Sequence, residues 1–211
     1  MKKVTYPHMG NMNIAVTSFL HEIGCESIEP PPITKKTMDL GVQNAPEFAC
    51  LPLKVNLGNY LEAMELGAEY ILMAGGAGPC RFGYYGEVQR EILHDLEKQM
   101  EMIVLEPNAW SIYRGFQKLA DKRLSLIRLY NILKYTLSKL RGVDQLEHMV
   151  QYVRPRSTDP RLVNKKFDSL KKKMEDASTI AKVEKVVREG KDELKNYIDP
   201  NHDPVLKVGI V

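Results

Sequence analysis

This 211-residue chain has three cysteines, and their thiols are its best candidates for nucleophilic or metal-ligand chemistry. Cys80 ends the loop 75–80, Gly-Gly-Ala-Gly-Pro-Cys, in which three glycines let a ligand approach the backbone closely. Cys50 stands just before Pro52, a residue type favoured in the first turn of a helix, so its thiolate would face free backbone NH groups. Cys25 begins a predicted strand. Buried apolar filler, reactive thiol and metal ligand are open roles for each, and Cys80 and Cys50 have the settings that best suit chemistry.

Strand-like and helix-like segments alternate through the first half of the chain. The apolar patterns predict strands at 4–6, 27–29, 70–74 and 102–105, and helices at 14–23, 34–40, 52–66 and 84–99. This alternation predicts an α/β fold over residues 1–107, a Rossmann-like domain with a parallel four-stranded sheet and flanking helices. Ligands bind beyond the carboxyl ends of parallel strands, so we expect Cys50 and Cys80 at that edge and Cys25 at the opposite one.

The second half of the chain has a different character. Residues 1–108 carry eight basic and 14 acidic side chains, a balance of −6, whereas 109–211 carry 22 and 13, a balance of +9. Residues 108–199 form a predicted helical segment, with apolar residues at helical spacing and no strand signal over 111–152, and a charged helix over 160–198. A linker and a strand follow in 200–211. We interpret that strand as the first of a second α/β domain in a longer protein, the alternative being an edge strand of the existing sheet.

Composition and motifs exclude several classes of protein. No apolar run is long enough to span a membrane and no signal-peptide core is present, so a cytoplasmic protein is expected. The odd number of cysteines argues against structural disulfides. Lysines of the basic half alternate with acidic residues, which predicts a solvated helical surface with no nucleic-acid partner. The glycine loop lacks the Lys-Ser/Thr pair of a P-loop and the spacing of a dinucleotide fingerprint.

Metal binding remains open at this point. The cysteines lack the short paired spacing of a zinc site. Thiolates at wide spacing on loops suit an iron–sulfur cluster better, although a cubane usually takes four cysteines.

Four segments resemble a known family, the 2-hydroxyacyl-CoA dehydratase component superfamily. They are Tyr-Pro-His-Met-Gly-Asn at 6–11, Pro-Pro-Pro-Ile-Thr at 30–34, Pro-Glu-Phe-Ala-Cys-Leu-Pro-Leu-Lys at 46–54 and Ala-Gly-Gly-Ala-Gly-Pro-Cys-Arg-Phe-Gly-Tyr-Tyr-Gly at 74–86. The likeness is to its branch related to CoA-enzyme activases and covers residues 4–107. It implies two Rossmann-like domains and a [4Fe–4S] or double-cubane cluster. Cys50 falls on the family's Phe-Ala-Cys position and Cys80 on its Gly-Pro-Cys position, so both would be cluster ligands, with a third ligand in a second domain beyond Val211.

The resemblance also implies a function. We expect an iron–sulfur component, or its N-terminal part, that receives a low-potential electron from an ATP-dependent activator and passes it to a 2-hydroxyacyl-CoA. If active, it would be a dehydratase-like lyase or a low-potential reductase component, and dimers are common in the family. Arg81 and Lys54 could place positive charge near a cluster or a CoA phosphate, or simply be solvated. The chain lacks the activator's ATPase signature.

Two other readings remain open. The fold could serve as a non-catalytic scaffold or regulatory partner of the activator. Alternatively, Cys50 and Cys80 could act as a thiol-redox pair that forms a reversible disulfide.

Overall fold

The computed structural model describes residues 1–202, and a parallel β-sheet organises the first part of the chain. The four strands lie in the order β2-β1-β3-β4: β1 (Lys3–Thr5), β2 (Glu26–Ser27), β3 (Tyr70–Ala74) and β4 (Glu101–Leu105). Their register runs from Tyr70 opposite Glu101 to Ala74 opposite Leu105 in the longest pairing. The predicted α/β fold with a parallel four-stranded sheet is confirmed.

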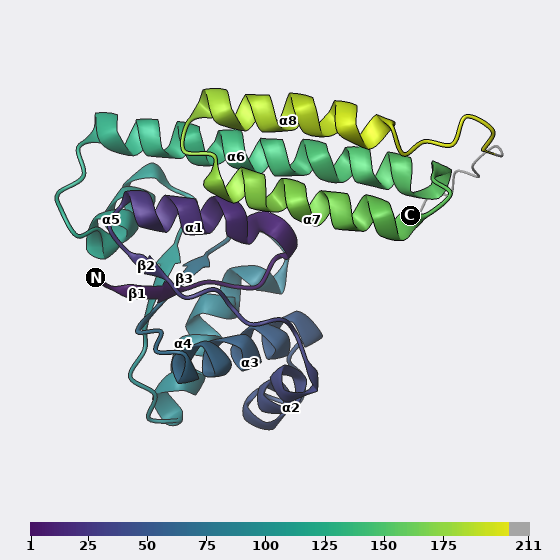
Figure 1. The fold of residues 1–211 in the computed structure, drawn as a ribbon. Coiled ribbons are helices and arrows are strands. Elements are labelled where there is room, and N and C mark those ends of the chain that lie inside the picture. The colour runs from purple at the N-terminus through teal and green to yellow at the C-terminus, as the bar shows by residue number, and fades with distance from the viewer. Residues whose placement is uncertain (203–211) are drawn as a thin grey trace. The chain divides into compact units, whose positions relative to one another are not determined.

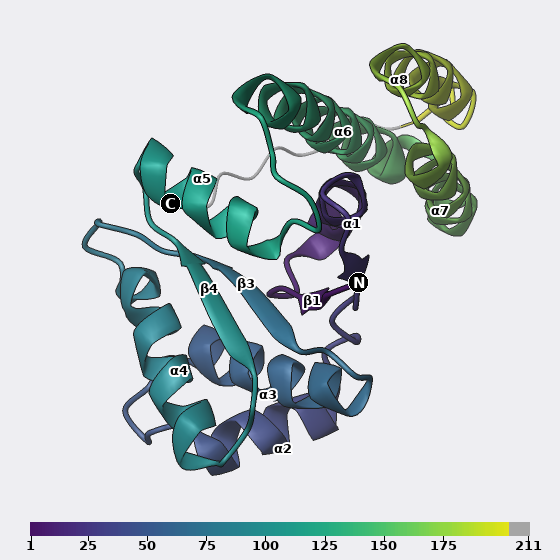
Figure 2. The same cartoon turned by 90° about the vertical axis from the view of Figure 1, so that its left-hand side faces the viewer.

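Helices cover both faces of this sheet, which is why its central strand is continuously apolar. Figure 2 shows α2, α3 and α4 on one face, and α5 with the C-terminal part of α1 on the other. On the second face the Phe19 and Phe116 rings pack with centroids 4.5 Å apart. The helices are α1 (Asn13–Glu22), α2 (Lys35–Asn44), α3 (Leu51–Glu65), α4 (Tyr85–Asp95) and α5 (Ala109–Leu119). Ile71 and Met73 of β3 are consequently buried.

Two glycines let α2 and α3 approach backbone to backbone. A Cβ added to Gly58 would overlap the carbonyl oxygen of Thr37, and one added to Gly41 would overlap that of Lys54. Beside this crossing the Thr37 hydroxyl donates a buried hydrogen bond of 2.6 Å to the Glu62 carboxylate. The position of α3, which begins next to Cys50, thus depends on glycine at positions 41 and 58.

The chain divides into two units, each with its own core. The first contains residues 1–13 and 19–129, and the second contains Ile14–Ser18 and the residues from Tyr130 onward. In the second unit α6 (Leu126–Val153), α7 (Pro160–Asp176) and α8 (Ile180–Lys195) lie side by side (Figure 1). Their apolar faces meet in a cluster that includes Leu146, Leu170 and Leu194.

A lysine is buried inside this second unit. The Lys139 side chain is 1% exposed, and its ammonium group donates 2.8 Å hydrogen bonds to the Ser18 hydroxyl and to the Glu175 carbonyl in the last turn of α7. The same ammonium lies 5.3 Å from the centre of the Tyr135 ring. A cation at a helix C-terminus is favourable because unpaired carbonyls end the helix there.

One predicted helix is wrong in its extent, and one predicted helical region is divided. The helical region predicted over 111–152 holds two helices. The backbone turns between α5 and α6, where the Leu124 amide donates to the Gln117 side chain and the Asp121 amide to the Ile23 carbonyl. The helix predicted over 160–198 is also two, because the Thr179 side chain caps a new helix by accepting from the Lys182 amide.

Short 3-10 helices complete the described chain: η1 (Gly10–Met12), η2 (Arg81–Tyr84) and η3 (Arg154–Arg156). The predicted final strand at 205–211 lies outside the described residues. Among the helices of residues 1–202, none combines the length and the apolar character that crossing a membrane requires.

Candidate functional site

The segments that carry Cys50 and Cys80 both belong to the carboxyl edge of the sheet. The backbone leaves β3 at Ala74, and the Gly75 amide extends the pairing by donating to the Leu105 carbonyl at 2.9 Å. The loop then delivers Cys80 to the start of η2, which leads into α4. Cys50 is the N-cap residue of α3, with Pro52 in the first turn. The N-terminal position predicted for Cys50 agrees with the structure, whereas a 3-10 turn separates Cys80 from the helix that follows it.

A tyrosine joins the two segments. The Cys50 sulfur and the Tyr85 hydroxyl are 2.7 Å apart, although 35 positions separate them in the chain. Tyr85 is the first residue of α4 and is buried, and its ring lies 5.3 Å from the Phe82 ring in a tilted arrangement. The contact therefore holds the beginning of α3 against the beginning of α4.

The Tyr85 hydroxyl favours the thiolate form of Cys50. Its hydrogen bond is the main reason that the pKa of Cys50 is lowered, against an opposing effect of burial. The Leu53 amide in the first turn of α3 and the positive charge of Arg81 act in the same direction as Tyr85. Cys50 is thus placed for nucleophilic or metal-ligand chemistry, because both require the thiolate.

The same surroundings keep Tyr85 protonated. Burial is the largest cause that raises the pKa of Tyr85 to about 12, followed by its hydrogen bond to Cys50 and by the negative charges of the Cys50 and Cys80 thiolates. The phenol is therefore protonated at neutral pH, and it is the donor whenever Cys50 is a thiolate. The negative charge of Cys80 is a smaller cause in the same direction.

The three cysteines differ in access to solvent. Cys80 is exposed, Cys50 is partly buried and Cys25 is buried. The Cys25 thiol donates to the Leu119 carbonyl at 3.3 Å, and burial is the main cause that raises its pKa. Cys25, just before β2, has the features of an apolar filler with a satisfied donor.

The glycines near the site differ in what surrounds them. A Cβ on Gly83 would overlap the carbonyl oxygen of Gly76, so the loop and η2 can meet only through glycine. A Cβ on Gly75 would lie 2.7 Å from a carboxylate oxygen of Glu106, the residue that follows β4. Gly78 faces open space. Close backbone packing therefore explains glycine at position 83, whereas the neighbour of position 75 is the movable end of a side chain.

The two predicted cations have different surroundings. Arg81 directly follows Cys80 and lowers the pKa of Cys50 through its positive charge. The Lys54 ammonium donates to the Glu47 carbonyl at 3.1 Å, on the loop that precedes α3. Of these two cations, Arg81 is the one that acts on Cys50.

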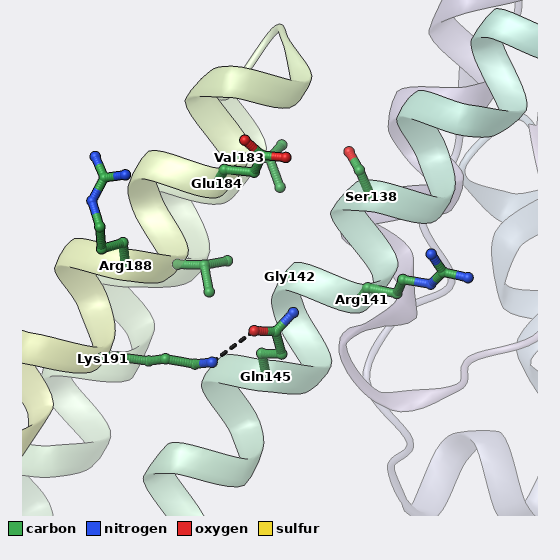
Figure 3. Close-up of a pocket in the computed structure, with 9 residues that line it drawn as sticks. Ser138, Arg141, Gly142, Gln145, Val183, Glu184, Arg188 and Lys191 are labelled. Carbon is green, nitrogen blue, oxygen red and sulfur yellow. Dashed lines mark hydrogen bonds between the residues drawn. The ribbon is translucent and has the colours of Figure 1, made fainter.

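A groove lies on the helical unit, between α6 and α8. This groove of about 500 Å³ has Gly142, Val183 and Val187 among its lining residues, together with the side chains of Arg141 and Arg188. Figure 3 shows the two guanidinium groups extending to opposite sides of the groove. The arginines therefore do not converge on one ligand position.

Sequence reasoning singled out both cysteines of the site but missed Tyr85. The residue was visible only as part of the run Gly-Tyr-Tyr-Gly at 83–86. No spacing rule relates a tyrosine to a cysteine 35 positions earlier, so the contact emerges only from the packing of α3 against α4.

The described chain provides thiols but no complete set of metal ligands. Within residues 1–202, no group of three or more His, Cys, Asp or Glu side chains is arranged to hold a metal ion. Comparisons of the chain with models of protein families, with curated proteins and with solved structures each find no match. A functional interpretation thus depends on the thiol site and on the motifs around it.

Proposed function

We propose that this protein is an iron–sulfur component of a 2-hydroxyacyl-CoA dehydratase-like system, with Cys50 and Cys80 as cluster ligands. The observation that carries the proposal is the pairing of Cys50 with Tyr85, which favours the thiolate form of Cys50. Thiolates are the ligands that iron–sulfur clusters take. The motifs at 46–54 and 74–86, which surround these cysteines, support the same assignment.

The residues of the chain would hold and tune the group. A bound cluster would supply a low-potential electron, received from an ATP-dependent activator and passed to a 2-hydroxyacyl-CoA. Cys50 and Cys80 provide two thiolates, and the Tyr85 hydroxyl donates to the Cys50 sulfur. Hydrogen bonds and positive charges near the sulfurs raise the reduction potential of such clusters, so Tyr85 and Arg81 would both favour the reduced form.

Anaerobic reconstitution tests the proposal. The full chain is treated with ferrous iron and sulfide, desalted, and examined for bound iron, acid-labile sulfide and an EPR signal after reduction. We expect Cys50→Ser and Cys80→Ser to lose iron and sulfide, and Cys25→Ala to retain both because Cys25 is buried with its thiol bonded to a carbonyl. Absence of iron from the unaltered chain, or equal iron in all four proteins, would refute the assignment.

A thiol-redox function is the second candidate, favoured by the lowered pKa of Cys50 and the exposure of Cys80. The two thiols would give two electrons and two protons to an external disulfide and become joined by a sulfur–sulfur bond. Peptide mapping after exposure to oxidised glutathione would reveal a Cys50–Cys80 crosslink. That crosslink, together with failure to retain iron, would establish the second function in place of the first.

A further inference from the structure

The first turns of α6 present a row of large apolar side chains to solvent. Ile127 is 76% exposed, Leu126 70% and Tyr130 65%. Leu137, further along the same helix, is 47% exposed. Figure 1 shows this end of α6 extending beyond the neighbouring ends of α7 and α8. A single exposed leucine is ordinary, but a row of large apolar side chains in water marks an interaction surface.

Basic side chains stand in the same row. Lys134 and Arg141 are exposed. They follow Tyr130 and Leu137 by one helical turn each, so α6 places all four on one face. We call this face the α6 stripe. It consists of Leu126, Ile127, Tyr130, Lys134, Leu137 and Arg141.

The stripe lies in a segment without acidic residues. Residues 122–143 contain six basic side chains and no Asp or Glu, so the alternation of charges predicted for the basic half does not extend to them. Five of the six are exposed, and the sixth is the buried Lys139. Negative charge begins where the stripe ends, because Asp144 follows on α6 and Glu184 of α8 lines the groove together with Arg141. The stripe therefore combines apolar and positive side chains without an acidic neighbour in its own part of the helix.

We propose that the α6 stripe binds the surface of a membrane that contains anionic lipids, with α6 lying along that surface. Aliphatic side chains enter the boundary between head groups and acyl chains, and lysine and arginine pair with the anionic head groups. Tyr130 suits this boundary because its ring is apolar and its hydroxyl is polar. Such binding differs from spanning, for which the helices of residues 1–202 are unsuited. It is independent of the proposed function of the thiol site.

Shape and charge favour a lipid surface over a protein partner. The stripe protrudes from one side of a single helix, whereas the groove between α6 and α8 takes its α6 lining from Ser138 onward. Protruding apolar side chains can enter a deformable bilayer, but a folded partner must supply a hollow that fits them. A second copy of the chain would bring Lys134 and Arg141 against the same cations, which repel each other.

Sedimentation with lipid vesicles tests the proposal. The full chain is mixed with vesicles of phosphatidylcholine alone, or of phosphatidylcholine in which about one-third of the lipid is phosphatidylserine, and the bound fraction is measured. We expect binding to the mixed vesicles, little binding to phosphatidylcholine alone, and release at high salt because ions screen the attraction. Absence of binding to the mixed vesicles, or equal binding to both compositions, would overturn the proposal.

Charge reversal locates the binding surface. Each Lys or Arg near an anionic surface strengthens binding by about fivefold, so Lys134→Glu combined with Arg141→Glu should weaken it by at least about 25-fold. The matched control is Lys165→Glu combined with Lys172→Glu, because both lysines are exposed on α7 and the net charge changes equally. The control should bind nearly as well as the unaltered protein. Equal losses in the two variants would assign binding to net charge and contradict the stripe.

Apolar contact is tested separately. Ile127→Ser combined with Tyr130→Ser keeps every charge and changes side chains that are mostly in solvent, so the fold should be retained. Binding to the mixed vesicles should fall by about tenfold or more, because two side chains no longer enter the bilayer. Tyr152→Ser combined with Leu162→Ser, at exposed apolar positions of α6 and α7 outside the stripe, is the control and should bind normally. Unchanged binding by the first variant would contradict insertion.

Poly-L-glutamate separates a lipid surface from an acidic protein. We expect the chain to prefer the mixed vesicles, because poly-L-glutamate offers charge without an apolar phase. Binding to poly-L-glutamate but not to the vesicles, lost in Lys134→Glu combined with Arg141→Glu, would overturn the lipid assignment and establish an acidic protein as the partner of the stripe.

Discussion

Replacement of Tyr85 by phenylalanine isolates the role of one hydroxyl at the thiol site. The ring and its packing against Phe82 remain, whereas the 2.7 Å hydrogen bond to the Cys50 sulfur is lost. A hydrogen bond to a charged group contributes about 1.5–3 kcal/mol. Because Cys50 is partly open to solvent, we take the lower value, about 1.5 kcal/mol, which corresponds to about a tenfold smaller thiolate population at neutral pH.

The rate of alkylation responds to two opposing changes. Loss of the hydrogen bond lowers the thiolate fraction at neutral pH, but the remaining thiolate is more basic and hence about threefold more nucleophilic. The net expectation is a three- to fourfold slower reaction of Cys50 with iodoacetamide at neutral pH. At high pH, where Cys50 is a thiolate in both proteins, Tyr85→Phe should instead react about threefold faster.

The measurement follows the mass of the intact protein during alkylation in a Cys80→Ser background, so that Cys50 is the accessible thiol. Tyr84→Phe is the matched control, since Tyr84 is the adjacent tyrosine and is largely exposed, and its rate profile should equal that of the parent. The diagnostic feature is that the alkylation rates of Tyr85→Phe and of its parent, plotted against pH, cross between neutral and high pH. A Tyr85→Phe rate that equals the parent at neutral pH, or lies below it at every pH, would refute the role assigned to the hydroxyl.

Three further outcomes follow from packing and burial. In denaturant titration, Gly58→Ala should lower the free energy of unfolding by about 1–3 kcal/mol or more, because its methyl group meets a backbone carbonyl. The control Gly78→Ala faces open space and should cost little. Equal effects of the two substitutions would contradict the close approach of α2 and α3. Lys139→Ala should cost about 2–4 kcal/mol, since it empties a buried site and removes two hydrogen bonds, and the exposed Lys134→Ala should stay within about 0.5 kcal/mol. The folded protein should take up two alkyl groups from excess iodoacetamide, with Cys25 labelled only in denaturant because it is buried; rapid native labelling of three thiols would contradict its position.

The sheet could be predicted because its signals are local. The run at 70–74 is continuously apolar, as a strand covered on both faces must be, and β3 spans these residues. The helix predicted at 52–66 is α3 at 51–65, since Pro52 and Gly67 mark its ends in the sequence. Patterns of this kind depend on nearest neighbours and need no knowledge of tertiary contacts.

The division of the two helical regions could be predicted only in part. Ser178 and Thr179 before Ile180 are a capping signal, which marks the boundary between α7 and α8. The turn after Leu119 lacks glycine or proline and is held by bonds from distant groups, including the Ile23 carbonyl. No local pattern announces such a turn.

At the site the residue types were predictable and their partners were not. Glycine, cysteine and proline at the ends of predicted strands and helices indicated Cys50 and Cys80. The pairing of Cys50 with Tyr85 depends on how α3 and α4 pack, which no sequence period encodes.

The grouping of Ile14–Ser18 with the helical unit has a consequence for how the protein is made. Ser18 is synthesised long before Lys139, yet the two side chains are hydrogen-bonded across 121 positions of sequence. The helical unit cannot complete its core until a segment synthesised at the outset is joined by one synthesised much later. A cut of the gene between codons 129 and 130 would therefore separate this core from one of its own pieces. Co-expression of residues 1–129 in trans would be needed to return that piece.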